Sequence, residues 1–393
     1  MNRKDRKRVR LGDVVQFNPS ESISRNNFAK KVTMDKLQPN CRDISDYETS
    51  TFAGGAKFRN GDTIMARITP CLENGKTARV SFLNDSEVAF GSTEFIVLRA
   101  SNNLTDSLFV YYLAISPYFR DIAIKSMVGS SGRQRVQQSV LENLEVNLPP
   151  LAEQRKIASI LSALDDKIEL NRRINDNLER QAQAIFKAWF VDSDMFPISW
   201  TTSNLLNIAS YINGLAMQKF RPCKNESGIP VLKIKELRQG YCDISSEVCS
   251  ENIKSDFIIN DGDVIFSWSG SLMVDIWCGG VCGLNQHLFK VTSKKFGKWF
   301  YYLWTNTHLQ NFIRIANDKA VTMGHIKRED LEKSTVLIPD TDTYNAMDQL
   351  MRSIFDKIID NKIENTRLGQ LRDTLLPRLM SGELSVEEVE QQL

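Results

Sequence analysis

Histidine, the side chain most often used for acid–base catalysis and metal binding, is scarce: the chain has three among 393 residues. None of the three stands in a spacing that is typical of a metal site or a catalytic triad. The GxxxxGK(S/T) phosphate loop, the GxGxxG dinucleotide fingerprint and the GxSxG nucleophile elbow are also missing. We therefore expect no catalytic residue, no metal ligand and no cofactor-binding residue in this chain.

Long apolar runs are missing too, and no run of about eighteen apolar residues suggests a membrane-spanning helix. The basic start, MNRKDRKRVR, is followed by no apolar stretch, so we interpret it as a solvated arm and not as a secretory signal. The seven cysteines are odd in number and scattered, as expected of free thiols in a reducing cytoplasm. Cys278, Cys282 and His287 lie close together in sequence, but zinc needs a fourth ligand and none is apparent.

Proline and glycine are absent for about forty residues after Pro150, which is long for an uninterrupted helix. Pro150 itself suits a helix start, because its missing N–H would be unsatisfied there in any case. Apolar residues recur at alternating steps of three and four, an average of about 3.5 residues that is typical of a coiled-coil seam. The predicted seam residues of this first helix are Ile157, Leu161, Leu164, Ile168, Asn171, Asn175 and Leu178.

The same pattern returns 190 residues later, where the predicted second helix ends at the glycine Gly382. Its seam residues are Met351, Ile354, Ile358, Asn361, Asn365 and Leu368. Both polar seam positions of the first helix, Asn171 and Asn175, therefore recur as asparagines in the second. A buried asparagine tolerates misalignment badly, so we interpret these residues as a device that sets the helix register. The alternative is that the seam is open to water at these positions.

The duplication extends into the rest of the chain. The segments 136–149 and 326–339 have the same length, and GDTI at 61–64 resembles GDVI at 262–265 at a spacing of 201 residues. With 42% hydrophobic and 25% charged residues, the composition is ordinary for a globular protein and sufficient for two cores. We predict a first globular domain at 1–148, a first helix at 149–191, a second globular domain at 192–341, a second helix at 342–384 and an acidic tail that frays at 385–393.

Each globular segment mixes strand-like and helical patterns. Residues 94–98 and 229–237 have the composition of strands, whereas 104–127 and 298–315 have apolar residues at helical spacing. The aromatic residues of 298–315 repeat at that spacing, so we expect them to form core. These patterns predict an α+β protein: two mixed α/β domains separated by two long helices, with a pseudo-twofold internal duplication.

The net charge of +2 is small, but the globular segments are mildly basic and the helices mildly acidic. This distribution favours polyanion contact through the globular domains and protein contact through the helices. Arg, Asn, Gln and Glu have hydrogen-bonding groups that match base edges, and lysines and glycine-rich loops suit phosphates. The candidate DNA-contacting residues of the first domain are Arg67, Thr69, Glu73, Asn74, Lys76, Arg133, Gln134 and Arg135. Those of the second domain are Lys219, Arg221, Lys235, Ser267, Trp268, Ser269, Asn285, Gln286, His287 and Lys327. The alternative is that these loops are ordinary surface turns.

Three stretches resemble a known family. PPLAEQRKIA at 149–158 and LDDKI at 164–168 resemble the central region of the specificity (S) subunit of Type I restriction–modification enzymes. LLPRLMSGEL at 375–384 resembles the C-terminal region of the same subunit. The second copy departs from the pattern, because PDTD at 339–342 stands where the first copy has its proline-rich motif.

The resemblance implies that each globular domain is a target recognition domain that reads one half of a bipartite site in double-stranded DNA. The two helices would pack antiparallel as a coiled-coil spacer. About forty helical residues span roughly 60 Å, which exceeds one turn of DNA at about 3.4 Å per base pair.

The resemblance also implies partners. Two methyltransferase (modification) subunits would bind S-adenosylmethionine and methylate N6 of a flipped adenine, and motor-nuclease (restriction) subunits would use ATP and Mg. Two alternatives remain open at this stage. A non-catalytic coiled-coil scaffold without sequence readout would show no salt-dependent DNA binding. A self-sufficient DNA-modifying enzyme would turn over alone, although no motif supports it.

Overall fold

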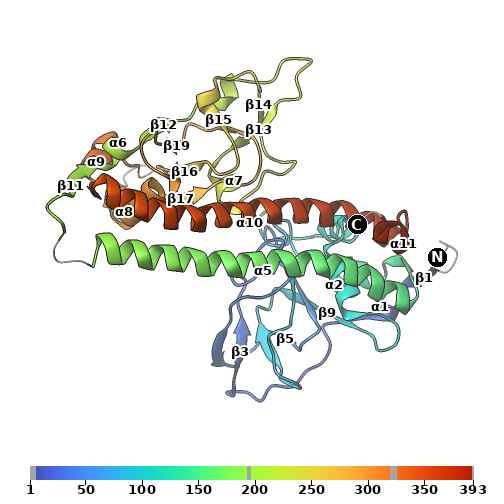
Figure 1. The fold of residues 1–393 in the computed structure, drawn as a ribbon. Coiled ribbons are helices and arrows are strands. Elements are labelled where there is room, and N and C mark those ends of the chain that lie inside the picture. The colour runs from blue at the N-terminus through green and yellow to red at the C-terminus, as the bar shows by residue number, and fades with distance from the viewer. Residues whose placement is uncertain (1–5, 193–195, 319–324, 392–393) are drawn as a thin grey trace. The chain divides into compact units, whose positions relative to one another are not determined.

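The computed structural model describes residues 6–192, 196–318 and 325–391. These residues form two compact units: the first includes the chain up to Asp166 and from Leu368 onward, and the second is Lys167–Arg367. Helices α5 (Leu151–Phe190) and α10 (Thr341–Ser381) are long and unbroken, and each contributes a segment to both units (Figure 1). None of the helices in the described ranges is long and apolar enough to cross a membrane.

The globular domain of the first unit contains three antiparallel or mixed sheets. Its sheets have the orders β1-β10, β2-β9-β6-β7 and β4-β3-β8-β5. The strands are β1 (Lys7–Arg10), β2 (Val15–Phe17), β3 (Phe28–Val32), β4 (Glu48–Thr51), β5 (Ala56–Phe58), β6 (Thr63–Ala66), β7 (Thr77–Arg79), β8 (Ala89–Gly91), β9 (Phe95–Ala100) and β10 (Glu145–Leu148). The helices of this domain are α1 (Leu11–Val14), α2 (Ser107–Ile115), α3 (Pro117–Lys125) and α4 (Gln138–Glu142).

The globular domain of the second unit repeats this topology strand for strand. Its sheet orders are β11-β20, β12-β19-β16-β17 and β14-β13-β18-β15. The strands are β11 (Thr201–Asn204), β12 (Ser210–Asn213), β13 (Ile229–Leu232), β14 (Val248–Cys249), β15 (Ile258–Ile259), β16 (Val264–Ser267), β17 (Met273–Ile276), β18 (Cys282–Leu284), β19 (Leu288–Thr292) and β20 (Thr335–Ile338). The helices are α6 (Leu205–Ile208), η2 (Met217–Lys219), α7 (Ile234–Gln239), η3 (Ser255–Phe257), α8 (Lys298–Asp318) and α9 (Arg328–Glu332). The predicted duplicated α/β fold is confirmed.

Local signals explain where the domain helices begin and end. The Asp106 carboxylate accepts hydrogen bonds from two backbone N–H groups in the first turn of α2, at 3.0 Å each. Ser116 ends α2 and caps α3, whose first residue, Pro117, cannot donate the hydrogen bond that would continue α2. The predicted helical character of 104–127 is therefore confirmed, and it is divided into two helices at Ser116.

Another expectation fails between residues 229 and 237, where the sequence has the composition of a strand. Strand β13 ends at Leu232, and the chain enters the short helix α7. The Glu236 carboxylate accepts a hydrogen bond from the backbone N–H of Lys233 at 3.3 Å, which stabilises the first turn of this helix. Gly240, with a φ of +82°, ends it.

The largest core cluster holds the second domain against its own segments of α5 and α10. Trp299, Phe300 and Phe312 of α8 are buried in it, which confirms the predicted core role of these aromatic residues. They share the cluster with Phe186 of α5 and Met351 of α10. Because burying one large apolar side chain contributes roughly 1.5–3 kcal/mol, this cluster is a major attachment of the domain to the helices.

All of the predicted seam residues of α5 and α10 are buried or half-buried. The asparagines meet in the second unit: Asn171 Nδ2 donates to Asn365 Oδ1 at 3.0 Å, and Asn361 Nδ2 donates to Asn175 Oδ1 at 2.8 Å. These two pairs run in opposite directions along the helices, so the helices are antiparallel there. Asn171 thus bonds to the repeat counterpart of Asn175, and Asn175 bonds to the repeat counterpart of Asn171. This reciprocal pairing suits a device that sets the helix register.

Both ends of the described chain are more ordered than the sequence indicates. Residues 7–10 form β1, which pairs with β10, and Arg6 donates to the backbone carbonyl of Leu379 at 3.0 Å. The expectation of a solvated arm is wrong for these residues, and residues 1–5 lie outside those described. Helix α11 (Val386–Glu390) is capped by Ser385 and buries Val386 and Val389. The expectation that the tail frays is therefore wrong for 386–390, because this short segment carries both a capping box and an apolar face.

Candidate nucleic-acid interface

The two candidate loops of the first domain lie side by side. Ile68 pairs with Arg135 as an antiparallel bridge, and the Thr69 backbone N–H donates to the Gln134 carbonyl at 3.0 Å. The Thr69 hydroxyl accepts a further hydrogen bond from the Gln134 N–H at 2.9 Å. Residues far apart in sequence therefore form one surface, which is supported by β6 on one side and by the segment leading to α4 on the other.

The cations of this surface differ in whether other protein groups already bind them. Arg135 forms an ion pair with Glu94 at 2.6 Å, and this contact lowers the pKa of Glu94 and raises that of Arg135. The Lys76 ammonium donates to the Met34 carbonyl at 2.7 Å and is half-buried. Arg133 is exposed, as are Glu73 and Asn74. Glu94 was not anticipated from the sequence, because nothing local marks it as the partner of Arg135.

The second domain builds the same junction from its own residues. Ser269 pairs with His325 as an antiparallel bridge, and the Trp268 carbonyl accepts a hydrogen bond from the Ile326 N–H at 3.2 Å. The Trp268 N–H donates to the His287 carbonyl at 3.4 Å. Segments 267–269, 285–287 and 325–327 therefore meet, and Ser269 and His325 occupy the repeat positions of Ile68 and Arg135.

Several predicted residues of this second surface are internal. Ser267, Ser269 and Asn285 are only 0%, 5% and 7% exposed. The Ser269 hydroxyl lies 2.9 Å from His287 Nδ1, and Trp268 Nε1 donates to Asn213 Oδ1 at 3.1 Å. The side chains of Ser267, Ser269 and Asn285 therefore shape the loop from inside. Trp268, Gln286 and His287 are half-buried, and Lys327 is exposed.

The remaining basic candidates lie on separate segments. Lys219 ends η2 and Arg221 follows it, and both are exposed. The Lys235 ammonium on α7 donates to the Ser245 hydroxyl at 2.9 Å. Within the described ranges, no group of three or more histidine, cysteine, aspartate or glutamate side chains is placed to hold a metal ion. His325 was missed by the sequence analysis, although the duplication marks it, because it lies 190 residues after Arg135.

Comparisons with known proteins agree with this geometry. Residues 3–180 and 197–373 each match the family described as the Type I restriction modification DNA specificity domain. The chain is 28% identical over 309 residues to the Type I restriction enzyme MjaIX specificity subunit of Methanocaldococcus jannaschii, covering 72% of this chain and 70% of the relative. It is 25% identical to the HindI specificity subunit of Haemophilus influenzae, covering 97% of this chain and 100% of the relative.

A solved structure shares the fold. The crystal structure of the Type I restriction–modification system S subunit from M. genitalium aligns with a TM-score of 0.52 at 13% identity, covering 95% of this chain and 96% of that chain. The family match includes both repeats, and the two repeats carry the same junction of loops. The chain therefore belongs to the family of Type I restriction–modification DNA specificity subunits, which supply DNA recognition and not catalysis to their complexes.

Proposed function

We propose that each target recognition domain reads one half of a bipartite site in double-stranded DNA through the surface built around its loop junction. The observation that supports this most directly is the repeat of that junction, Ile68 with Arg135 and Ser269 with His325. Two equivalent surfaces in one chain suit a site with two separate halves. Different side chains on the two surfaces suit two different half-site sequences.

The contacts of the first domain divide by chemistry. Arg133 is exposed and stands on a glycine-containing turn, which suits a phosphate contact. Arg135 is held by Glu94, so its guanidinium fork is oriented and suits a base edge, where a fixed bidentate donor is selective. Glu73 and Asn74 extend from the adjoining loop and have the groups that hydrogen-bond to cytosine and adenine.

In the second domain, the half-buried side chains Trp268, Gln286 and His287 are the candidates for base contact. Lys327, exposed at the start of α9, suits a phosphate. Ser267, Ser269 and Asn285 act from inside by holding the loop in shape.

The subunit acts in a complex with modification and restriction subunits. In this proposal, two methyltransferase subunits dock on the subunit, bind S-adenosylmethionine and methylate N6 of an adenine in each half-site. Motor-nuclease subunits, which use ATP and Mg, then cleave unmethylated DNA. The antiparallel helices serve as the spacer between the two half-site readers, and their paired asparagines keep the helix register that this spacing needs.

The test is base-resolution mapping of methylated adenine in cells that carry this chain with its methyltransferase partner. Cells that lack only this chain provide the comparison. We expect a two-part motif with a fixed gap that disappears without the chain. Unchanged methylation would refute the proposal and favour a scaffold without sequence readout.

Alanine variants then assign the residues. Arg135→Ala should relax one position of one half-site at a cost of roughly 1–3 kcal/mol, whereas Arg133→Ala should reduce the salt slope of binding by about one. Arg173→Ala is a matched control, since Arg173 is an exposed cation on α5 outside either loop junction. If Arg135→Ala leaves both the affinity and the motif unchanged, its assigned role is wrong.

A further inference from the structure

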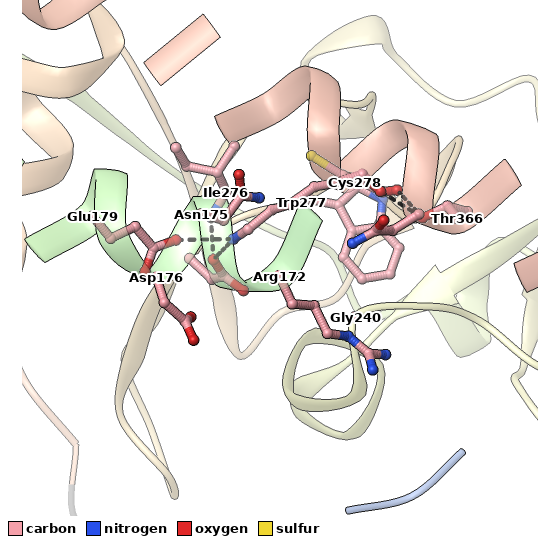
Figure 2. A pocket seen from close by; sticks show the side chains of 12 residues that line it. Arg172, Asn175, Asp176, Glu179, Gly240, Ile276, Trp277, Cys278 and Thr366 are labelled. Carbon is pink, nitrogen blue, oxygen red and sulfur yellow. Dashed lines mark hydrogen bonds and ion pairs between the residues drawn. The ribbon is translucent and has the colours of Figure 1, made fainter. Parts of the chain in front are cut away.

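A cavity of about 260 Å³ lies in the second unit, where β17 and the residues after it face α5 and α10 (Figure 2). No sequence motif marks it. Five of the twelve residues that line it are charged. The charged residues that line it are Arg172, Asp176, Glu179, Asp275 and Lys362.

Lys362 of α10 lines this cavity and contacts acidic side chains of β17 and α5. Its ammonium lies 2.8 Å from Asp275 Oδ1 on β17 and 3.9 Å from Glu179 Oε1 on α5. Burial alone would lower the pKa of Lys362, but Asp275 and then Glu179 raise it above its ordinary value, so the side chain stays charged. One turn further along α10, the Thr366 hydroxyl donates to the Cys278 carbonyl at 2.9 Å, a bond that is drawn in Figure 2. Two directional bonds therefore join α10 to this edge of the domain.

Strand β17 connects that edge to the candidate DNA-contacting loop. It forms a hairpin with β16, in which Asp275 is opposite Ile265 and Met273 is opposite Ser267. Trp268 and the residues after it, up to the start of β17 at Met273, form the turn of this hairpin. At about 3.3 Å per residue, Lys362 contacts the strand only roughly 7 Å from the start of the turn. A shift of Asp275 is therefore passed to the loop by a short, paired strand.

The first domain has a comparable contact made from other residues. Arg42 Nη2 lies 2.7 Å from Asp166 Oδ1 on α5, and the Arg42 carbonyl accepts a hydrogen bond from the Arg79 N–H of β7 at 2.7 Å. Strand β7 is the counterpart of β17 in the repeated topology. Both domains thus join the outer strand of the same hairpin to a long helix through a cation and a carboxylate.

The polarity of this contact is reversed between the copies. The domain supplies the cation in the first copy, and the helix supplies it in the second. The repeat counterpart of Lys362 is Arg172, and that of Asp166 is Asp356, so neither contact is a residue-for-residue copy of the other. Each copy therefore has an ion pair of its own between the domain and a long helix, at Asp166 in the first copy and at Lys362, the repeat counterpart of Arg172, in the second.

We propose that the Lys362–Asp275 pair is a positioning contact that holds the DNA-reading loop of the second domain at one place along α10, and so makes the complex strict about the gap between half-sites. This inference rests on the proposed bipartite readout. The apolar core also attaches the domain, but hydrophobic contact is non-directional. A charged hydrogen bond has a defined length and angle, and therefore fixes position as well as association.

The test uses the full chain in complex with its methyltransferase partner and measures adenine methylation at sites of every gap length. In Lys362→Met, methylation at gaps one base pair longer or shorter should rise by roughly ten- to hundredfold. This is the factor by which losing one hydrogen bond between charged groups changes an equilibrium constant. Lys362→Arg keeps the cation and should restore strictness. Arg172→Met, which removes the counterpart cation from the same cavity, should leave the gap preference unchanged.

The outcomes separate the possible roles. If Lys362→Met keeps the strict gap, or lowers methylation equally at all gaps together with a lower melting temperature, the pair is merely structural and the inference is wrong. Asp275→Asn should relax the gap preference as Lys362→Met does. The double variant should relax it no further than either single variant, because all three variants lose the same bond between Lys362 and Asp275. Additive effects would also overturn the inference. Absence of any two-part motif with the wild-type chain would instead refute the proposed function.

Discussion

A buried ion pair in the first unit provides a quantitative test of how the helices are held. Arg372 Nη1 of α10 donates to Asp165 Oδ1 of α5 at 2.7 Å, and the two side chains are only 9% and 5% exposed. The Tyr112 hydroxyl donates to the other carboxylate oxygen at 2.7 Å. The repeat counterparts of Arg372 and Asp165 are Ala182 and Phe355, and both are buried in the apolar cluster of the second unit. One layer of the duplicated helices is therefore charged, and its counterpart is apolar.

This asymmetry predicts that a single substitution destabilises the protein strongly, whereas a double substitution changes its stability little. Arg372→Ala leaves the Asp165 carboxylate buried without its cation, which should lower the free energy of unfolding by about 3–5 kcal/mol. The double variant Asp165→Phe/Arg372→Ala copies the layer of the second unit. A buried ion pair can be replaced by apolar residues of similar total volume at little cost. The free energy of unfolding of the double variant should therefore lie within roughly 1–2 kcal/mol of the wild-type value. The Tyr112 hydroxyl, which loses its acceptor, supplies part of that difference.

The assay is urea unfolding followed by circular dichroism for wild type and both variants. Arg173→Ala serves as the control, since replacing an exposed helical arginine should change stability by less than about 0.5 kcal/mol. The reasoning is refuted if Arg372→Ala costs less than about 1 kcal/mol, because the pair would then behave as a surface contact. It is also refuted if the double variant is as unstable as the single one.

Four further predictions concern other parts of the chain. Asn175→Leu leaves the Asn361 amide without its acceptor and should lower the free energy of unfolding by about 1–3 kcal/mol; no change in urea unfolding would indicate that the seam is wet there. Burial raises the pKa of Glu179, so its carboxylate destabilises the fold above that pKa and the cost disappears as the pH falls through it. Glu179→Gln should therefore raise the melting temperature slightly near pH 8 but not near pH 3, and an equal shift at both would contradict this. Burial raises the pKa of Cys278 to about 11, so iodoacetamide should label it far more slowly than the exposed Cys223, as peptide mass spectrometry can measure; equal rates would count against its burial. Val389→Asp places a charge in the apolar face of α11 and should raise hydrogen exchange in that helix, whereas unchanged exchange would mean that this face does not hold it.

The long helices illustrate what a sequence can predict well. Their period, the absence of proline and glycine from the first helix, and the glycine after the second are local signals, since each depends on residues within one or two turns. The structure has α5 and α10 at these places, and Gly382 follows α10 with a φ of +73°. The strand expectation for 229–237 is confirmed for 229–232 and wrong for the rest, where the Lys233 backbone N–H donates to the Glu236 carboxylate and favours a helix.

The candidate site was partly accessible from the sequence. Composition selected the loops at 67–76 and 133–135, but it could not say that Thr69 contacts Gln134. The duplication could have been used more fully, because a shift of 190 residues leads from Arg135 to His325. Burial was not accessible, and Ser267, Ser269 and Asn285, which have the composition of a contact loop, face inward.

The sequence by itself determined the duplicated plan, the two long helices, the family and the absence of known catalytic motifs, because repeats, periods and motifs are properties of residue order. Only the tertiary structure decided which loops meet and which charges are neutralised. Arg135 and Glu94 are separated by 41 residues, and Lys362 and Asp275 by 87. Such pairs form because strand pairing and helix packing bring distant segments together, and no local preference of either residue specifies its partner.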